Sequence, residues 1–182
     1  AIGAEALDGV LEGSTVDGTV AIGKSALGAL TAGTGNTVIG YLAADALTTG
    51  ANNTTLGYET LSAANRTENG NIAIGYQAMS AVDEGQNDGA GTQAADGNVA
   101  IGSNALTGGD LGDNNDSTTR NFVGNIAIGM DTLNSTGANP QTGTIAIGHD
   151  ALTALTDGSE NTAIGYNCLD AETEGGQSTA IG

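Results

Sequence analysis

The chain has 182 residues, with 21 acidic residues against three basic ones and a formal net charge of −18. This charge argues against nucleic acid and against an anionic membrane surface as partners, because both are bound through cationic side chains. Aromatic content is 3%, which disfavours a compact core built on large rings, and 31 glycines without a strict three-residue period exclude collagen.

An Ile-Gly or Leu-Gly pair recurs along the whole chain, with consecutive glycines 17 to 27 residues apart. A constant minimum spacing of 17 residues, with extra residues in some repeats, predicts one structural coil per repeat and insertions in the loops. β-branched residues before the glycine favour strands over helices. The glycines of the pair are Gly3, Gly23, Gly40, Gly57, Gly75, Gly102, Gly129, Gly148, Gly165 and Gly182.

A short strand is therefore expected immediately before each glycine, from residue 20 onward. The residue before the glycine is Ile in every repeat except at Leu56, the residue two before is mostly Ala, and the residue three before is β-branched. Asn or another polar residue marks the entry to the strand, as at Asn36. The repeat isoleucines include Ile22, Ile39, Ile74, Ile101, Ile128, Ile147 and Ile164.

Alternate residues of a strand share a face, so Ile and the β-branched residue point one way and Ala points the other. We expect Ile101 and Val99, with their equivalents, to fill the interior of the coil. Ala100 and its equivalents would then face outward, where a small side chain permits close approach of a second copy of the chain. This interpretation predicts an oligomer.

A second pattern follows each glycine, as in "KSAL" at 24–27 and "YQAM" at 76–79. A small residue and then Leu or Met predict another short buried segment after a tight turn, for which the glycine supplies the bend or a positive φ. "YLAADAL" at 41–47 departs from the pattern because its Leu47 comes three places late, and a bulge is expected in that coil.

"NTAIGYNCL" at 161–169 and its relatives resemble the repeats of trimeric, YadA-head-like β-rolls, which occur in phage tail fibres and trimeric autotransporter adhesins. The resemblance spans essentially the whole chain, although the adhesin repeats are shorter. It implies a left-handed β-roll, a homotrimer, and an extracellular place on a cell or virion surface. The expected fold is an all-β parallel β-solenoid of nine to ten coils, with residues 1–182 as one segment of a longer chain.

Two long insertions, 80–97 and 107–124, carry acidic residues among Gly and Asn. Loops on a rigid scaffold are where recognition usually resides, so we expect these two to contact a host glycan or protein receptor. Ca²⁺ binding is an alternative, although the spacing lacks the EF-hand pattern. Arg120 and Phe122 are expected to hold the end of the second insertion. The acidic residues concerned are Asp83, Glu84, Asp88, Asp110, Asp113 and Asp116.

Three further features are interpreted as structural. His149 replaces Tyr at a corner of the coil, and Cys168 takes the place of a small buried Ala; a nucleophile–base pair of these two, one coil apart, is the functional alternative. The four tyrosines share one position in the repeat, which favours ladder packing, with a sugar-binding stripe as the alternative. No metal or cofactor is expected.

These observations predict a structural fibre or adhesin segment that projects from a surface and contributes to attachment. No catalytic residue is expected, because nothing singles out a pair of carboxylates for glycoside hydrolysis. The expected partners are other copies of the chain and a receptor, with neither nucleic acid nor direct membrane insertion. The alternative is an extracellular ligand-binding solenoid of the Ca²⁺- or ice-binding type.

Overall fold

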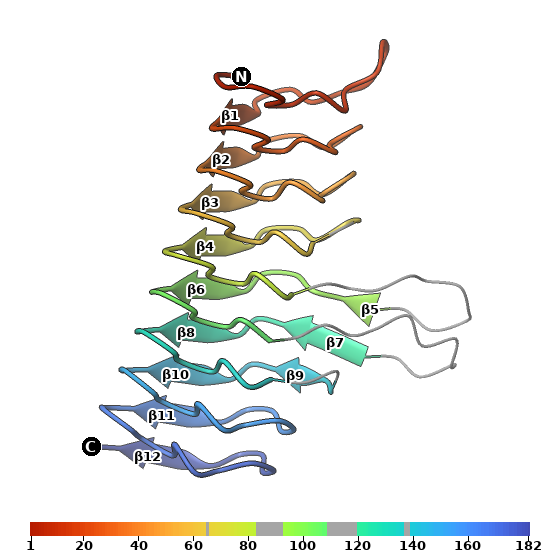
Figure 1. Ribbon diagram of the computed structural model, residues 1–182. Helices are drawn as coiled ribbons and strands as arrows, with labels where there is room; N and C mark the ends of the chain where they lie inside the picture. Colours follow the sequence, from red (N-terminus) through yellow and green to blue (C-terminus); the bar gives the residue numbers. More distant parts are fainter. Residues whose placement is uncertain (65, 83–92, 109–119, 137–138) are drawn as a thin grey trace.

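The computed structural model describes residues 1–64, 66–82, 93–108, 120–136 and 139–182. In these ranges the chain is all-β, without a helix, and it winds as a parallel β-solenoid (Figure 1). None of the described segments forms an apolar helix of membrane-spanning length. The predicted fold class is therefore confirmed.

The main sheet has nine parallel strands, each one coil apart from the next. Pairing is in register throughout: Ala73 lies opposite Ala100, and Ala100 lies opposite Ala127. Eight turns join these strands, and an Ile2–Ile22 bridge adds a further turn at the start. In sheet order the strands are β1 (Val20–Ile22), β2 (Thr37–Ile39), β3 (Thr54–Leu56), β4 (Ile72–Ile74), β6 (Val99–Ile101), β8 (Ile126–Ile128), β10 (Ile145–Ile147), β11 (Thr162–Ile164) and β12 (Thr179–Ile181).

A second, three-stranded parallel sheet lies in the coils that carry extra residues. It consists of β5 (Gln93–Ala94), β7 (Arg120–Val123) and β9 (Gln141–Thr142). The extra residues do not disturb the main sheet, because β4 and β6 pair in the same register as β1 and β2. The insertions therefore extend the loops without changing the register of the main sheet.

The ends of the two insertions belong to the coil. Val82, Ala95 and Phe122 are fully buried, so Phe122 is part of the core, as its expected anchoring role requires. The acidic residues proposed for recognition (Asp83, Glu84, Asp88, Asp110, Asp113 and Asp116) lie outside the described residues, and so does the side chain of Arg120.

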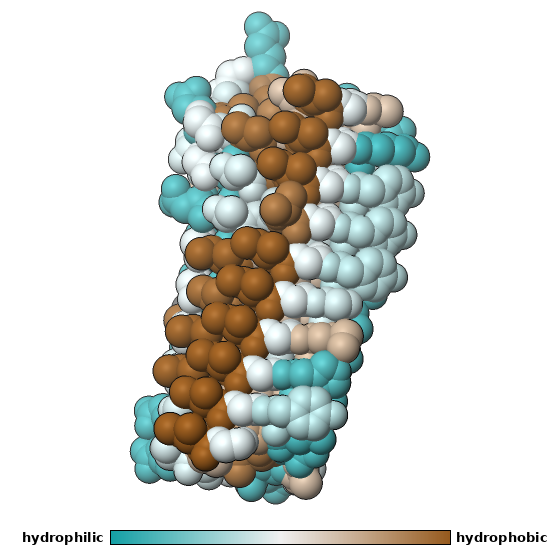
Figure 2. Space-filling model, turned by 90° about the vertical axis from the view of Figure 1, so that its left-hand side faces the viewer, coloured by the Kyte–Doolittle hydropathy of each residue, from teal (hydrophilic) through white to brown (hydrophobic). Residues whose placement is uncertain are grey.

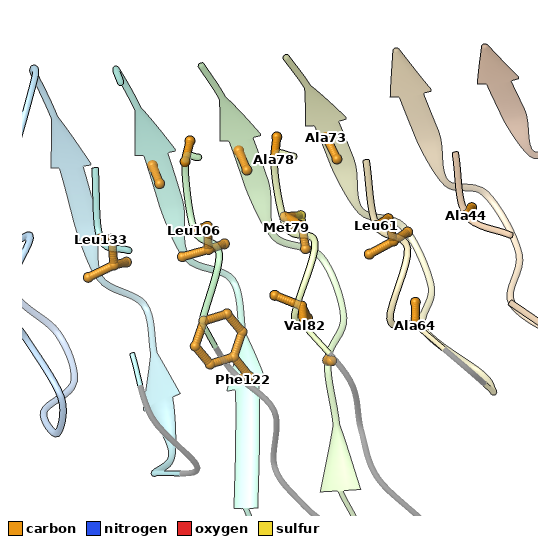
Figure 3. Close-up of a cluster of buried hydrophobic side chains, with 14 of the residues drawn as sticks. Ala44, Leu61, Ala64, Ala73, Ala78, Met79, Val82, Leu106, Phe122 and Leu133 are labelled. Atoms are coloured by element: carbon orange, nitrogen blue, oxygen red, sulfur yellow. The ribbon is translucent and has the colours of Figure 1, made fainter. Parts of the chain in front are cut away.

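The predicted assignment of the strand faces is wrong. Ala100 is fully buried, whereas Ile101 is 36% exposed, and the same alternation recurs in the other strands of the main sheet from β1 to β11. Alanine therefore points into the coil, and Ile and the β-branched residues point out of it. The reason is volume: the opposite wall already fills the interior with Leu61, Met79 and Leu106, which leaves room only for small side chains on the strand wall (Figure 3).

The opposite wall, called the turn wall here, is the second buried segment that the sequence predicted. Ala78 and Met79 are adjacent in sequence and both fully buried, which a regular strand with one face in solvent does not allow. Left-handed backbone makes it possible, because Gln77 and Met79 have φ values of 52° and 56°. Coil-to-coil hydrogen bonds continue through this wall, for example from Met79 N–H to the Ala105 carbonyl (3.0 Å).

The bulge expected at 41–47 is absent. Ala44, with a φ of 47°, occupies the position of Leu in the other coils, and its N–H donates to the Thr60 carbonyl at 2.8 Å. Leu47 is fully buried and bonds back to Ala44, as Leu30 bonds back to Leu27. Leu47 is therefore a regular member of a second buried position, three residues farther along the coil.

The glycine at the corner is required by the stacking. Gly102 has a φ of 139°, and a Cβ on it would lie 2.3 Å from the carbonyl oxygen of Gly129 in the next coil. Each such glycine stacks directly on the next, so the corner admits no side chain. This confirms the predicted role of the glycine in the turn.

A ladder of buried asparagines runs inside the solenoid, and the sequence interpretation missed it. Asn98 donates from its backbone to Oδ1 of Asn71 (2.9 Å) and from Nδ2 to the Phe122 carbonyl (2.8 Å), and its own Oδ1 accepts from Asn125 N–H (3.0 Å). Each asparagine thus satisfies backbone groups at the corner where the chain enters the strand. The members are Asn36, Asn53, Asn71, Asn98, Asn125 and Asn161.

Candidate interaction surface

The outward face of the main sheet is an apolar stripe, made of two columns of side chains. Figure 2 shows it as a continuous band along the whole solenoid. None of its residues is buried. The first column is Val20, Thr37, Thr54, Ile72, Val99, Ile126, Ile145, Thr162 and Thr179; the second is Ile22, Ile39, Leu56, Ile74, Ile101, Ile128, Ile147, Ile164 and Ile181.

The stripe is long and substantially exposed. Leu56 is 48% exposed, Val20 43% and Ile72 37%. Eight spacings of about 4.8 Å give it a length of about 38 Å. Single exposed apolar residues are common on proteins, whereas a contiguous apolar surface of this extent is typical of an interaction site.

The stripe carries no charge, although the chain has a net charge of −18. Its second column is followed directly by the stacked corner glycines, such as Gly75 and Gly102, which contribute no side chain. No acidic residue belongs to the stripe itself, so a partner packed on its two columns meets no carboxylate within them.

Beyond the glycines lies a column of rings. Tyr41, Tyr58 and Tyr76 stack with 5.3 Å between ring centroids, and Lys24 lies 6.0 Å from the Tyr41 centroid at one end. His149 stacks on Tyr166 at 5.4 Å. Both faces of Tyr58 are covered by neighbouring rings, which is the arrangement expected for ladder packing and leaves only the edge of that ring for a sugar.

Two groups near the aromatic column have shifted pKa values. A hydrogen bond with Glu59 raises the pKa of the Tyr58 hydroxyl, because it is lost when Tyr58 ionises. Burial raises the pKa of Asp45, although hydrogen bonds from the backbone oppose the shift, and the charge of Glu59 raises it further. The first shift arises mainly between adjacent residues of one coil, and the second mainly from burial.

The alternative pairing of Cys168 with His149 does not occur. Cys168 is 7% exposed, lies inside the coil, and its thiol donates to the carbonyl of Ala180 at 3.3 Å. His149 lies on the outer surface, stacked on Tyr166. The two side chains lie on opposite sides of the turn wall, so Cys168 has no base there.

The part of the chain that the structure describes encloses no pocket, so the surfaces above are what it offers to a partner. Comparison of the chain with protein-family models, with curated proteins and with solved structures found no significant match in any of the three. The geometry of the surface therefore carries the functional argument.

Proposed function

We propose that this chain is a structural segment of an extracellular fibre or surface adhesin, in which copies pack together through the apolar stripe. The repeat resemblance supports three copies around one axis and a place on a virion or cell surface. In this assembly the chain projects an attachment site away from the surface that bears it.

The observation that carries the proposal is the match between the stripe and the repeat of the solenoid. Its side chains recur once per coil, at about 4.8 Å, over all nine strands. Only a partner with the same repeat can interlock with such a surface along its full length. A second copy of the chain has that repeat by construction, and its own stripe is also uncharged.

Burial of the stripe favours assembly. Completing the burial of a half-exposed Ile or Leu contributes about 1 kcal/mol. In the second column Leu56, Ile101 and Ile181 are 48%, 36% and 75% exposed, and the other six residues are less exposed, so each of those six contributes less than this before the cost of association.

The side of the coil that bears the insertions remains free in this arrangement. Figure 1 shows β5, β7 and β9 set away from the corner at which the strands of the main sheet end. We assign recognition of a glycan or protein receptor to the insertions within 80–97 and 107–124, because packing through the stripe leaves that side open.

Light scattering coupled to gel filtration tests the proposal. The wild-type chain is expected to have three times the mass of one chain, and the double substitution Ile101→Asp with Ile128→Asp is expected to have the mass of one. Leu11→Asp is the matched control, because Leu11 is 69% exposed but lies outside the stripe. It should leave the mass unchanged.

A monomeric wild type, or a double variant that keeps the wild-type mass, would contradict the proposal. Circular dichroism checks that each variant retains its β-structure. If the double Asp variant does not fold, Ile101→Thr with Ile128→Thr replaces it, since strands of the main sheet already carry outward Thr in the neighbouring first column, at Thr54 and Thr162.

A further inference from the structure

One cluster on the outer surface of the turn wall combines nitrogen and oxygen donors. Asp131, His149 and Asp150 each place one potential ligand atom within 4.8 Å of the others. All three residues are half-buried, so the cluster is partly shielded and still open to solvent. The proposed fibre function does not use it.

The coil stacking brings these three residues together. Asp131 and Asp150 stand at the same position of consecutive coils, two residues after Gly129 and Gly148. Asp150 N–H donates to the Met130 carbonyl at 3.1 Å, which fixes the spacing of the two coils. Both aspartates have left-handed backbone, with φ values of 54° and 57°, so their side chains leave the wall in the same direction.

Elsewhere in this column each carboxylate bonds to a neutral neighbour. Ser25 donates to Glu5 (2.8 Å) and Gln77 donates to Glu59 (2.7 Å). Only at Asp131 and Asp150 do two carboxylates follow one another along the column. Like charges one coil apart repel, and a cation between them relieves the repulsion.

Asp131 is also positioned from its other side. Asn104, in the preceding coil, donates from Nδ2 to a carboxylate oxygen of Asp131 at 2.9 Å. A hydrogen bond of this kind orients a carboxylate that serves as a metal ligand.

His149 completes the donor set. Its Nδ1 lies 2.7 Å from Oδ2 of Asp150, within the distance of an ion pair when the ring is protonated, although the contact does not have hydrogen-bond geometry and Nδ1 is shielded from solvent. Two ligand atoms that are each about 2.1 Å from one tetrahedral metal ion are about 3.4 Å apart. The two side chains therefore need to separate by less than about 1 Å to share an ion, and stacking on Tyr166 holds the ring close to this position.

We propose that Asp131, His149 and Asp150 bind one divalent transition-metal ion of the zinc class. The imidazole nitrogen selects first-row transition metals over Ca²⁺ and Mg²⁺, which take oxygen ligands. Three protein ligands leave the remaining positions to water. Because the ligands come from two consecutive coils, the bound ion joins them and stabilises the stack.

Calorimetric titration of the whole chain with Zn²⁺, and separately with Co²⁺, tests the proposal. His149→Tyr is the most informative variant, because Tyr occupies this position at Tyr41, Tyr58, Tyr76 and Tyr166 and fits the stack. Asp131→Asn removes a carboxylate ligand. Asp8→Asn is the matched control, since it makes the same chemical change at an exposed position outside the cluster.

The wild type is expected to bind one ion per chain with saturation. His149→Tyr and Asp131→Asn should each weaken binding at least tenfold, and Asp8→Asn should change it less than twofold. Paramagnetic Co²⁺ should also shift the ring protons of His149, the only histidine in the chain. Absence of saturable binding, or equal affinities for His149→Tyr and Asp8→Asn, would overturn the proposal and indicate diffuse attraction to an acidic protein.

Discussion

The inward and outward faces of the main sheet are both apolar, but they are specified by different physical requirements. On the inward face, the residue at position 100 must be small, because the side chains of the turn wall fill the space opposite. The residue at position 98 must be Asn, because its side chain makes the hydrogen bonds of the ladder. Outside, Ile101 and Val99 meet no other part of the described chain that buries them. The comparison teaches that one face specifies the coil and that the other is available for a partner.

The largest expected effect separates these two faces directly. Ala100→Asp places an uncompensated carboxylate inside the coil and should lower the free energy of unfolding by about 3–5 kcal/mol. Ile101→Asp, one residue away, should keep the coil folded and instead prevent assembly. Urea unfolding at one fixed chain concentration measures the stability of the two variants, and light scattering measures their mass in solution. Equal loss of stability in the two variants would remove the distinction.

Gly102→Ala tests the corner between the faces. The added Cβ meets the Gly129 carbonyl oxygen at 2.3 Å and needs a φ of 139°, so a loss of about 2–4 kcal/mol is expected. The control is Gly97→Ala in the same coil. Gly97 has a φ of 66°, and a Cβ added there would meet no atom within 4 Å, so only the left-handed penalty of about 1 kcal/mol should appear. Similar losses at both sites would show that the stacking contact is unimportant.

Thr144→Asn tests the hydrogen bonds of the inward face and should stabilise the solenoid. Thr144 interrupts the asparagine ladder, and its buried Oγ1 makes no hydrogen bond. Thr144 makes only one of the ladder's hydrogen bonds: its N–H donates to Oδ1 of Asn125 at 3.0 Å. Asparagine at this position should bond to the coils on both sides and raise the free energy of unfolding by about 1 kcal/mol.

Thr144→Val is the comparison for that gain, because it removes the unsatisfied hydroxyl without extending the ladder. Thermal and urea unfolding should rank Asn above Val at position 144. A gain from Val that equals or exceeds the gain from Asn would assign the effect to the hydroxyl alone.

The smallest expected effect concerns pH. Burial raises the pKa of Asp45 above its ordinary value of 3.8, so ionised Asp45 opposes folding above the raised pKa, and this cost disappears once pH falls below 3.8. Asp45→Asn should therefore increase the melting temperature slightly at pH 7 and have no such effect below pH 3.8. A gain independent of pH would show that the charge is not its cause.

The repeat allowed the strands, their register and the second buried segment to be predicted from the sequence. All three depend on the position of the glycine, and Gly75, Gly102 and Gly129 do stack on one another. The orientation of the faces was not predictable from hydropathy, since Ala100 and Ile101 are both apolar. It depends on the volume left by Leu106 and its neighbours across the coil.

One clue to the orientation was present. Asn98 is two residues before Ala100 and therefore on the same face of the strand. An asparagine that recurs on the face of the small residue indicates that protein hydrogen bonds, rather than water, satisfy its side chain, and hence that this face is the inner one. The Asp131–His149–Asp150 cluster could be found only by aligning consecutive coils, because Asp131 and His149 are 18 residues apart in sequence. The direction of the side chains required the left-handed backbone of the turn wall.

The most direct test of the central claim is oxidative cross-linking of single cysteines on the two faces. In a Cys168→Ala background, which removes the only native cysteine, Ile101→Cys and Ala100→Cys are compared under mild oxidation. If copies meet in register through the outward stripe, Ile101→Cys forms disulfide-linked chains and Ala100→Cys does not. Cross-linking from Ala100→Cys, or none from Ile101→Cys, would contradict the account.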